Sequence, residues 1–300
     1  MEADFIAWLQ DQSKTAGSVF GDFTDDAALI PADSQLVVTT DAITEGVDFV
    51  LAEATPEQIG YKSVMVNASD IAAMGAIPTH LFVNLVIPTQ WTLASIKALY
   101  AGIQRAASIC GCEISGGDFN TWEGGLVVTV CMHGHCKSQQ PILRSTAKPG
   151  DLLCVSGGLG GSILGHHLSF TARIGLLDLL SEHVQISSAM DISDGLSSDL
   201  PRLCKASNVG AIVDSDRLPI TESARRLSDK DGFSPVDHAL NDGEDFELMY
   251  TIQPHNFETN PLPKELHESL FVIGEITQDK QLILRSGKTT SSLEPRGFMH

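Results

Sequence analysis

The chain has 300 residues, of which 43% are hydrophobic and 19% charged, and its formal net charge is −19. This length and composition are typical of a globular protein of about two domains and exclude a disordered chain. The negative charge argues against nucleic acids and anionic membranes as partners, whereas converging carboxylates favour cations such as Mg²⁺.

The six cysteines form no CxxC pair, which argues against a disulfide scaffold or a zinc ribbon. The first four residues, Met-Glu-Ala-Asp, are acidic and do not resemble a basic signal-peptide region. No run of 18 apolar residues is free of charges and proline, so no membrane span is expected. We therefore expect a cytoplasmic protein with reduced thiols.

The first 140 residues predict a mixed α/β domain in which strands and helices alternate. The clearest helix begins after Thr55, a suitable N-cap that Pro56 follows, and ends near Gly75. A second helix is predicted from Thr92 to about Gly111 by apolar residues at helical spacing. The other expected elements are a short helix at 5–12 and strands at 35–41, 80–87, near 113 and at 125–135.

A turn at Lys148–Asp151 begins a second mixed α/β domain, so we divide the chain into domains 1–140 and 141–300. A strand at 152–156 leads into the glycine turn Gly157–Gly161 and then into an expected helix. A further helix is expected after Gly195. The remaining predicted strands lie at 211–214, 247–252, 270–276 and 282–285.

Two motifs in the sequence are weak signals of a ligand site. The glycine turn does not complete GxGxxG, so it either presents N–H groups to a phosphate or forms a tight strand-to-helix turn, and we favour the turn. Cys131, His133 and His135 share one face of a strand but spread over roughly 13 Å, which disfavours a transition-metal site. No Walker A motif or protein-kinase signature occurs, so ATP would bind differently from those classes.

Acidic residues in glycine-rich turns and at strand ends are the most informative feature. Each is typical of a cap or a turn when it is considered alone. Their recurrence in both halves predicts a Mg²⁺ site around phosphate groups. They are Asp26, Asp41, Asp70, Asp118, Asp191, Asp194 and the turn Gly243–Asp245.

Seven stretches resemble one known family, in the family's order and over nearly the whole chain. They are TDDAALI (24–30), TTDAITEGVDF (39–49), YKSVMVNASDIAAMGAIP (61–78), GGDF (116–119), RSTAKPGD (144–151), AMDISDGLSSDL (189–200) and NDGEDFEL (241–248). The chain resembles the thiamine-monophosphate kinases, of the superfamily that includes aminoimidazole ribonucleotide synthetase.

The resemblance implies an α/β (α+β) fold. It has an N-terminal ferredoxin-like unit that forms a β-barrel across a homodimer, and a C-terminal mixed α/β domain. It also implies an enzyme that uses ATP to phosphorylate thiamine phosphate to thiamine diphosphate. The transfer is expected to be direct and in line, with several Mg²⁺ ions as cofactors.

The resemblance also implies roles for individual residues. The expected metal ligands are Asp26, Thr39, Thr40, Asp41, Asp70, Asp118, Asp191 and Asp194, and Asp70, Asp118 and Asp191 are the expected catalytic residues. The nucleotide-contacting positions are Tyr100, Gly117, Asp118, Arg144 and Ser193. The expected contacts to the thiamine substrate are Asp48, Glu244 and Phe298.

Three positions depart from the family pattern. Thr24 stands where the family usually has Gly, and Asp48 where it has a His-like contact; the segment 161–189 is shorter than usual. Two alternatives stay open: another ATP-dependent synthetase of the superfamily, and a catalytically silent nucleotide-binding module. A selenophosphate synthetase would need a reactive N-terminal Cys, whereas the first cysteine here is Cys110.

Overall fold

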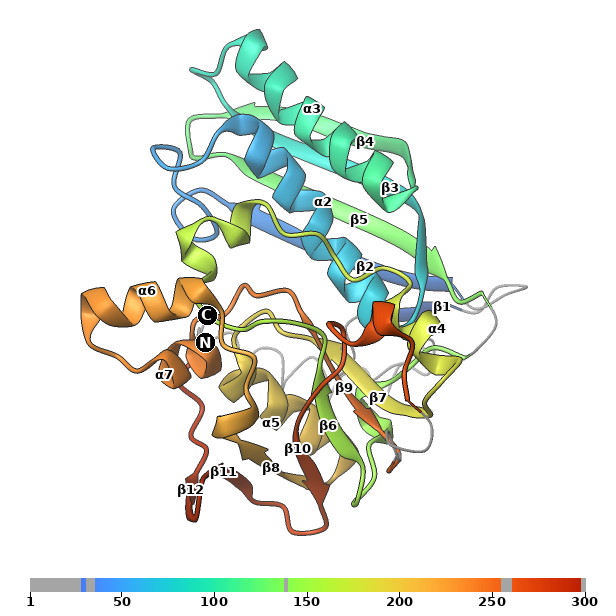
Figure 1. Cartoon of the computed structure of the whole chain (residues 1–300). Helices are drawn as coiled ribbons and strands as arrows, with labels where there is room; N and C mark the ends of the chain where they lie inside the picture. The colour runs from blue at the N-terminus through green and yellow to red at the C-terminus, as the bar shows by residue number, and fades with distance from the viewer. Residues whose placement is uncertain (1–27, 31–35, 138–139, 255–260, 298–300) are drawn as a thin grey trace, which may run out of the picture.

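The computed structural model describes residues 28–30, 36–137, 140–254 and 261–297. Their strands form two sheets, and helix α2 lies between the first sheet and the second half of the chain (Figure 1). The helix expected at 5–12, Thr24, Asp26 and Phe298 lie outside the described residues. None of the described helices combines the length and the apolarity that crossing a bilayer requires.

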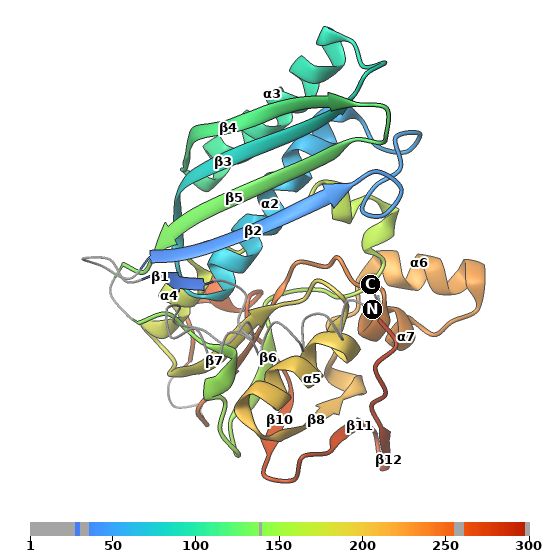
Figure 2. The ribbon, with the colours of Figure 1, turned by 180° about the vertical axis from the view of Figure 1, so that it is seen from behind.

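The first sheet is built from five strands in the described part of the chain, in the order β1-β2-β5-β3-β4. Helices α2 (Pro56–Ala73) and α3 (Leu93–Cys110) cover one face (Figure 1), and no element of the described residues covers the other, here called the uncovered face (Figure 2). The strands are β1 (Ala28–Ile30), β2 (Leu36–Thr44), β3 (Ile77–Pro88), β4 (Glu113–Trp122) and β5 (Val127–His135).

The pattern of burial along β3 explains why one face is covered. Leu81, Val83 and Leu85 are at most 6% exposed, whereas Phe82 between them is 36% exposed. Alternate residues of a strand point to opposite faces, so the apolar set lies under the helices. Phe82 therefore marks the uncovered face.

Helix α2 begins and ends as its sequence predicts. Thr55 and Gln58 form a capping box, and Pro56 occupies the first turn. Its residue Gly60 lies against α3, where a Cβ would stand 2.0 Å from the carbonyl oxygen of Leu99. The missing side chain thus allows the two helices to cross closely. Almost every residue of α2 is buried because the helix touches the first sheet, α3 and the second half of the chain.

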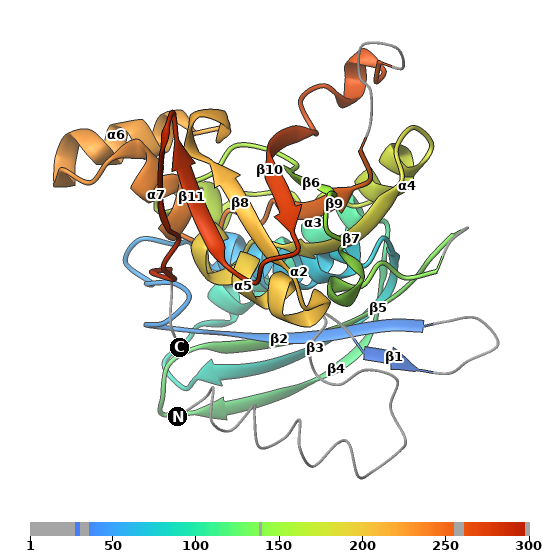
Figure 3. The ribbon, with the colours of Figure 1, turned by 90° about the horizontal axis from the view of Figure 1, so that it is seen from below.

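The second sheet is built from seven strands in the described part of the chain, in the order β12-β11-β8-β10-β6-β9-β7. Seen from below, α6 lies beyond the β12 end of this sheet and α4 beyond the β7 end (Figure 3). The strands are β6 (Leu152–Val155), β7 (Ile186–Asp191), β8 (Gly210–Asp214), β9 (Leu248–Ile252), β10 (Phe271–Thr277), β11 (Leu282–Ser286) and β12 (Thr289–Ser292). The helices are α4 (Leu176–Ser181), α5 (Leu196–Ser207), α6 (Glu222–Asp231) and α7 (Pro235–Asn241).

Several expected elements have different bounds in the structure. Strand β2 continues to Thr44, so Asp41 lies inside it and does not end it. Strand β4 runs through Gly116-Gly117-Asp118, because pairing with β3 outweighs the low strand propensity of those residues. The glycine turn leads into two single 3₁₀ turns rather than an α-helix, because Gly160, Gly161 and Gly165 have positive φ angles.

The connectivity of the first sheet also differs from the ferredoxin-like unit that was expected. The chain order from β2 to β5 is strand, helix, strand, helix, strand, strand, whereas a ferredoxin-like unit has β-α-β-β-α-β order. Strand β3 pairs in parallel with β4 through the crossover helix α3. The coarser expectation, a mixed α/β architecture in both halves, is confirmed.

Candidate functional site

Carboxylate and hydroxyl groups of the first sheet meet at helix α2. The Thr39 hydroxyl on β2 donates a hydrogen bond to Asp70 Oδ2 on α2 at 2.6 Å. One helical turn earlier, Asn67 Oδ1 accepts the backbone N–H of Asp41 at 3.2 Å. Asp41 pairs with Val130, a buried residue under the helices, so Asp41 belongs to the covered face. The structure therefore brings Thr39, Asp41 and Asp70 together.

The second half of the chain adds an acid to the same place. Asp191 ends β7, is only 4% exposed, and accepts a hydrogen bond from the Ser69 hydroxyl at 2.8 Å. Ser69 directly precedes Asp70 on α2. One short stretch of α2 thus joins an acid of β7 to a hydroxyl of β2, although the two strands lie in different sheets.

Asp194 is held by a charge network at the start of α5, in which the two carboxylates are buried and Arg202 is partly exposed. The Arg202 guanidinium lies 2.5 Å from Asp194 Oδ2 and 2.9 Å from Asp199 Oδ1, and the Asp194 N–H donates to Asp199. Burial, together with the negative charge of Asp194, raises the pKa of Asp199 to about 7, although Arg202 and Arg144 oppose the rise. The backbone of Arg144 lies beside α5, because the Ser207 hydroxyl of that helix donates to the Arg144 carbonyl at 2.6 Å.

Asp118 and Thr40 lie on the uncovered face of the first sheet. Asp118 pairs with Asn84 on β3, and Thr40 pairs with Cys131 on β5, which in turn pairs with Phe82. Strands β2 and β4 are three positions apart in the sheet, or roughly 14 Å at the usual strand spacing. Within one chain, Asp118 is therefore separated from Asp70 by the thickness of the sheet as well as its width.

The donor set at α2 fits a hard cation but is incomplete within the described residues. No group of three or more His, Cys, Asp and Glu side chains in the described ranges is arranged to hold a metal ion. This finding includes Cys131, His133 and His135, which were considered for a transition metal. The hydroxyl and carboxylate oxygens that do converge are ligands that Mg²⁺ prefers, and phosphate oxygens commonly complete such sites.

Glu244 and Ser193 lie beside each other because two loops run together. The Glu244 N–H donates to the Ser193 carbonyl at 2.6 Å, and Gly243 would bring a Cβ within 2.9 Å of the same oxygen. The Glu244 carboxylate forms an ion pair with Lys62 of α2, and the Lys62 ammonium also donates to the Asp48 carbonyl at 2.7 Å. The structure thus joins two of the predicted substrate contacts, Asp48 and Glu244, through Lys62.

The expected nucleotide contacts come from four different parts of the chain. Tyr100 lies on α3, is partly buried, and packs against the hydrophobic core between the first sheet and its helices. Gly117 lies in β4, where a Cβ would meet the carbonyl oxygen of Val83. Arg144 begins a 3₁₀ turn. Ser193 lies between β7 and α5.

Lys62, Arg173, Arg202 and Glu247 were not identified from the sequence. Arg173 forms two hydrogen bonds with Glu247, which is 4% exposed. The one available signal was Lys62 itself, a cation close to the apolar residues Val64–Val66 of the predicted helix.

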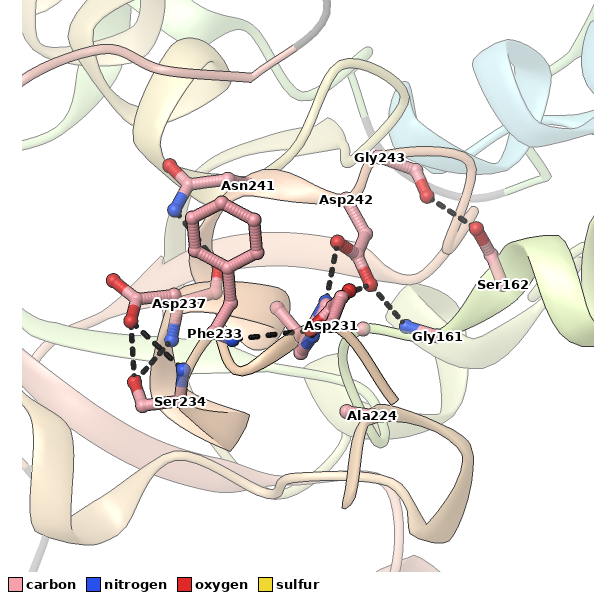
Figure 4. A network of polar contacts seen from close by, with 12 residues as sticks. Gly161, Ser162, Ala224, Asp231, Phe233, Ser234, Asp237, Asn241, Asp242 and Gly243 are labelled. Carbon is pink, nitrogen blue, oxygen red and sulfur yellow. Dashed lines mark hydrogen bonds and ion pairs between the residues drawn. The ribbon is translucent and has the colours of Figure 1, made fainter. Parts of the chain in front are cut away.

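The glycine turn is a structural turn whose N–H groups are already used. The Gly161 N–H donates to Asp242 at 2.6 Å (Figure 4), and the Gly160 N–H donates to Asp245 at 2.9 Å. Burial raises the pKa of Asp245 well above its ordinary value. Carboxylates already accept hydrogen bonds from these two N–H groups. Of the two interpretations of the glycine turn, the structure therefore favours the tight turn and not a phosphate-binding site.

Asp242 also belongs to a network around His238 of α7. His238 Nδ1 lies 2.9 Å from Asp242 Oδ1, and Nε2 lies 3.3 Å from Asp231 Oδ1. Burial alone would lower the pKa of His238, but hydrogen bonds and charge from the two carboxylates outweigh burial and raise the pKa. The His238 imidazole therefore links Asp231, the last residue of α6, to Asp242, the carboxylate that accepts from the glycine turn.

We expect the stabilisation that His238 provides to depend on pH. Because the folded-state pKa is raised, the stabilisation is complete below the unfolded value of about 6.5 and disappears as the pH rises through the folded value. His238→Gln should lower the free energy of unfolding by more at pH 6 than at pH 9. The two losses should differ by up to about 1 kcal/mol. Urea unfolding at both pH values measures this, and His183→Gln is the control, on an exposed histidine. An equal difference at both pH values would contradict the assignment.

Two family models match most of the chain. Residues 24–136 match the N-terminal domain of the AIR synthase related proteins, and residues 153–286 match their C-terminal domain. Among curated relatives, the thiamine-monophosphate kinase of Rhodopirellula baltica is 36% identical, over 100% of this chain and 97% of its own length. The enzyme of the same name from Bacillus subtilis is 33% identical, over 100% and 99%.

Solved structures of the same class have the same fold. A structure described as AaThiL complexed with AMPPCP and TMP has a TM-score of 0.81 and 25% identity, covering 96% of this chain and 94% of that one. Thiamine-monophosphate kinase from Stenotrophomonas maltophilia has a TM-score of 0.74 and 30% identity, covering 93% and 94%. The hydrogenase maturation protein HypE of E. coli, at a TM-score of 0.71 and 19% identity, shares the fold alone, covering 97% and 96%.

Proposed function

The chain belongs to the thiamine-monophosphate kinases among the AIR synthase related proteins, and we propose that it transfers the γ-phosphoryl group of ATP to thiamine phosphate, which yields ADP and thiamine diphosphate. The observation that carries this proposal is the similarity to thiamine-monophosphate kinases over the full length of the chain. A relative that holds a nonhydrolysable nucleotide together with TMP supports the same pair of substrates.

We propose that the transfer is direct and in line. The acceptor phosphate oxygen is already a good nucleophile at neutral pH, so no general base is required. Phosphoryl transfer needs little covalent help from the protein and depends mainly on positioning and charge. The contacts at α2 serve that purpose: Thr39 fixes the orientation of Asp70, and Ser69 fixes that of Asp191.

The residues at α2 fit Mg²⁺ as the metal. When bound, Mg²⁺ would neutralise phosphate charge and align the reacting oxygens. Several ions would be held by Thr39 and Asp41 of β2, Asp70 of α2 and Asp191 of β7, and Asp194 would join from the start of α5. Asp26, Thr40 and Asp118 remain proposed ligands, of which Asp26 lies outside the described residues.

At the nucleotide end, we propose that Arg144 donates to phosphate or ribose oxygens and that Ser193 and Tyr100 contact the nucleotide. Arg144 suits this role because its guanidinium is always charged and forms paired hydrogen bonds. At the acceptor end, Glu244 and Asp48 would face the cationic thiazolium, with Phe298 as the proposed aromatic contact. The negative charge of Asp48 is attractive to that ring and repulsive to the acceptor phosphate.

We further propose a homodimer that completes the site. Strand β1 pairs only with residues 36–38 of β2, which leaves the rest of that edge without a partner among the described strands, and β4 forms the opposite edge. Among the described residues no helix covers the face between the two edges, where Phe82 and Trp122 are exposed. Closing two such sheets edge to edge into a barrel would remove both edges and bring Asp118 of one protomer near Thr40 of its partner.

We also propose that the chain forms two domains whose boundary lies near residue 140, between β5 and β6. We propose further that the protein is located in the reducing cytoplasm. All six cysteines are free, as they would be in that compartment.

The test is an acceptor screen. Purified protein with Mg²⁺ and ATP is incubated with thiamine phosphate, thiamine and other phosphorylated acceptors, and thiamine diphosphate and ADP are quantified. We expect stoichiometric thiamine diphosphate and ADP from thiamine phosphate. Turnover of another acceptor instead would indicate a different synthetase of the superfamily, and nucleotide binding without turnover of any acceptor would indicate a silent homologue.

A further inference from the structure

Lys62 is a fully buried cation that the reaction described above does not use. It lies in the middle of α2 and is 1% exposed. Removing an ammonium group from water is costly unless anionic or carbonyl partners replace the hydration. Its location therefore requires partners, and the two that the ammonium contacts come from loops that lie 14 and 182 residues away in the sequence.

The first partner is the loop after β2. The Asp48 carbonyl accepts from the Lys62 ammonium at 2.7 Å, and the Asp48 carboxylate accepts the backbone N–H of Thr44 at 2.6 Å. These two contacts fix Asp48 at both its backbone and its side chain. Lys62 therefore holds the loop from inside the first domain.

The second partner, Glu244, comes from the other half of the chain. Its backbone has a φ of 52°, and Phe246 has a φ of 49°, both in the left-handed region that non-glycine residues rarely adopt. Phe246 stacks on Phe170 with ring centroids 4.1 Å apart. Strained backbone of this kind persists where the surroundings enforce it, and it often accompanies a functional site.

The ion pair with Lys62 leaves part of the Glu244 carboxylate exposed. The contact with Lys62 is made by Oε1, and the side chain remains 33% exposed while Lys62 is 1% exposed. The cation is thus behind the carboxylate, and part of the carboxylate faces outward. This arrangement fixes an anion and presents it to a ligand.

We infer that Lys62 is a positioning residue that determines affinity for the acceptor by fixing Glu244 and the Asp48 loop against the cationic ring of thiamine phosphate. The inference rests on the proposed function. Lys62 itself does not touch the acceptor phosphate. Without the ammonium, the Glu244 side chain is free to turn into solvent, and the loop loses the contact that ties it to α2.

The test compares Lys62→Met, which keeps the length of the side chain and removes its charge, with Arg105→Gln as a matched control. Arg105 is an exposed cation of α3 that pairs with Glu57 of α2. For Lys62→Met we expect the KM for thiamine phosphate to rise about tenfold or more, with the KM for ATP within about twofold. The inhibition constant of thiamine, which lacks the phosphate, should rise by the same factor. Arg105→Gln should change none of these.

A double-mutant cycle separates positioning from a general structural role. In a Glu244→Gln background, Lys62→Met should raise the KM for thiamine phosphate by less than about twofold, because most of its effect acts through that carboxylate and only the contact with the Asp48 loop is still lost. If Lys62→Met does not fold, Lys62→Gln can replace it, because glutamine keeps N–H donors without the charge. Lys62→Gln should also raise the KM for thiamine phosphate more than the KM for ATP, by a smaller factor than we expect for Lys62→Met.

Three results would overturn the inference alone: equal changes in both KM values, an undiminished effect of Lys62→Met in the Glu244→Gln background, or an effect on thiamine phosphate that thiamine does not share. Thiamine phosphate turnover by the unaltered chain is measured first. Its absence would overturn the proposed function and, with it, this inference, so the two failures are distinguishable.

Discussion

Asp70→Asn should lower kcat for thiamine diphosphate formation by at least about 10³-fold while the protein remains folded. Asp70 lies where α2 meets β2, and it accepts the Thr39 hydroxyl hydrogen bond at 2.6 Å. An asparagine oxygen accepts the same bond, so the local packing is kept. What the variant lacks is the negative charge that we propose to hold the cation beside the ATP phosphates.

The measurement is steady-state turnover at saturating ATP and thiamine phosphate, with thermal unfolding followed in parallel. A second readout is the dependence of nucleotide affinity on Mg²⁺, which should weaken in the variant. Glu57→Gln is the matched control, because Glu57 is an exposed carboxylate on the same helix. Near-normal turnover of Asp70→Asn would refute the role of this acid.

Mixing two inactive variants, Asp70→Asn and Asp118→Asn, should restore about a quarter of the wild-type activity. Asp118 lies on the uncovered face, three strands from β2, so within one chain it does not reach Asp70. If it serves the partner's site, each heterodimer contains one site with both acids intact. Random exchange makes half of the dimers heterodimers, and half of their sites are complete.

The experiment requires subunit exchange of the separately purified variants, followed by the turnover assay. Asp118→Asn should fold normally, because Asp118 is exposed and its recorded contact is with Asn120 at 2.8 Å. A mixture of Asp70→Asn with Asp191→Asn is the control. These two acids adjoin the same stretch of α2 within one chain, so no activity should return. Failure of the first mixture to recover, despite proven exchange, would place Asp118 in its own chain's site.

Local signals in the sequence located the principal helices well. Helix α2 begins after Thr55 and Pro56 as predicted, and α3 ends at Gly111, whose φ is 67°. Caps and helical spacing depend on neighbouring residues only, so they can be recognised without the fold. The family resemblance is confirmed for the same reason, because its motifs are contiguous stretches of sequence.

Strand bounds and turns were less predictable because they depend on distant partners. Strand β4 was recognised only near Glu113, whereas pairing with β3 extends it to Trp122 through two glycines. The helix expected after the glycine turn is absent among the described residues. There, Asp242 and Asp245, some eighty residues away in sequence, bind the N–H groups of the turn.

The sequence by itself determined the family and the class of reaction, because these follow from which side chains are present and in what order. It also predicted that the acids would gather around phosphates and a cation. Only the tertiary structure decided which of these residues lie together and which lie apart. Thr39, Asp41, Asp70 and Asp191 meet at α2, whereas Asp118 lies on the opposite face of the sheet.

The tertiary structure alone also showed Lys62 between Asp48 and Glu244, which lie 14 and 182 residues from it in the sequence. The physical reason is common to both findings. The face on which a strand residue lies depends on register, and the partner of a buried charge depends on which loops the fold brings beside it, and neither is encoded in local spacing.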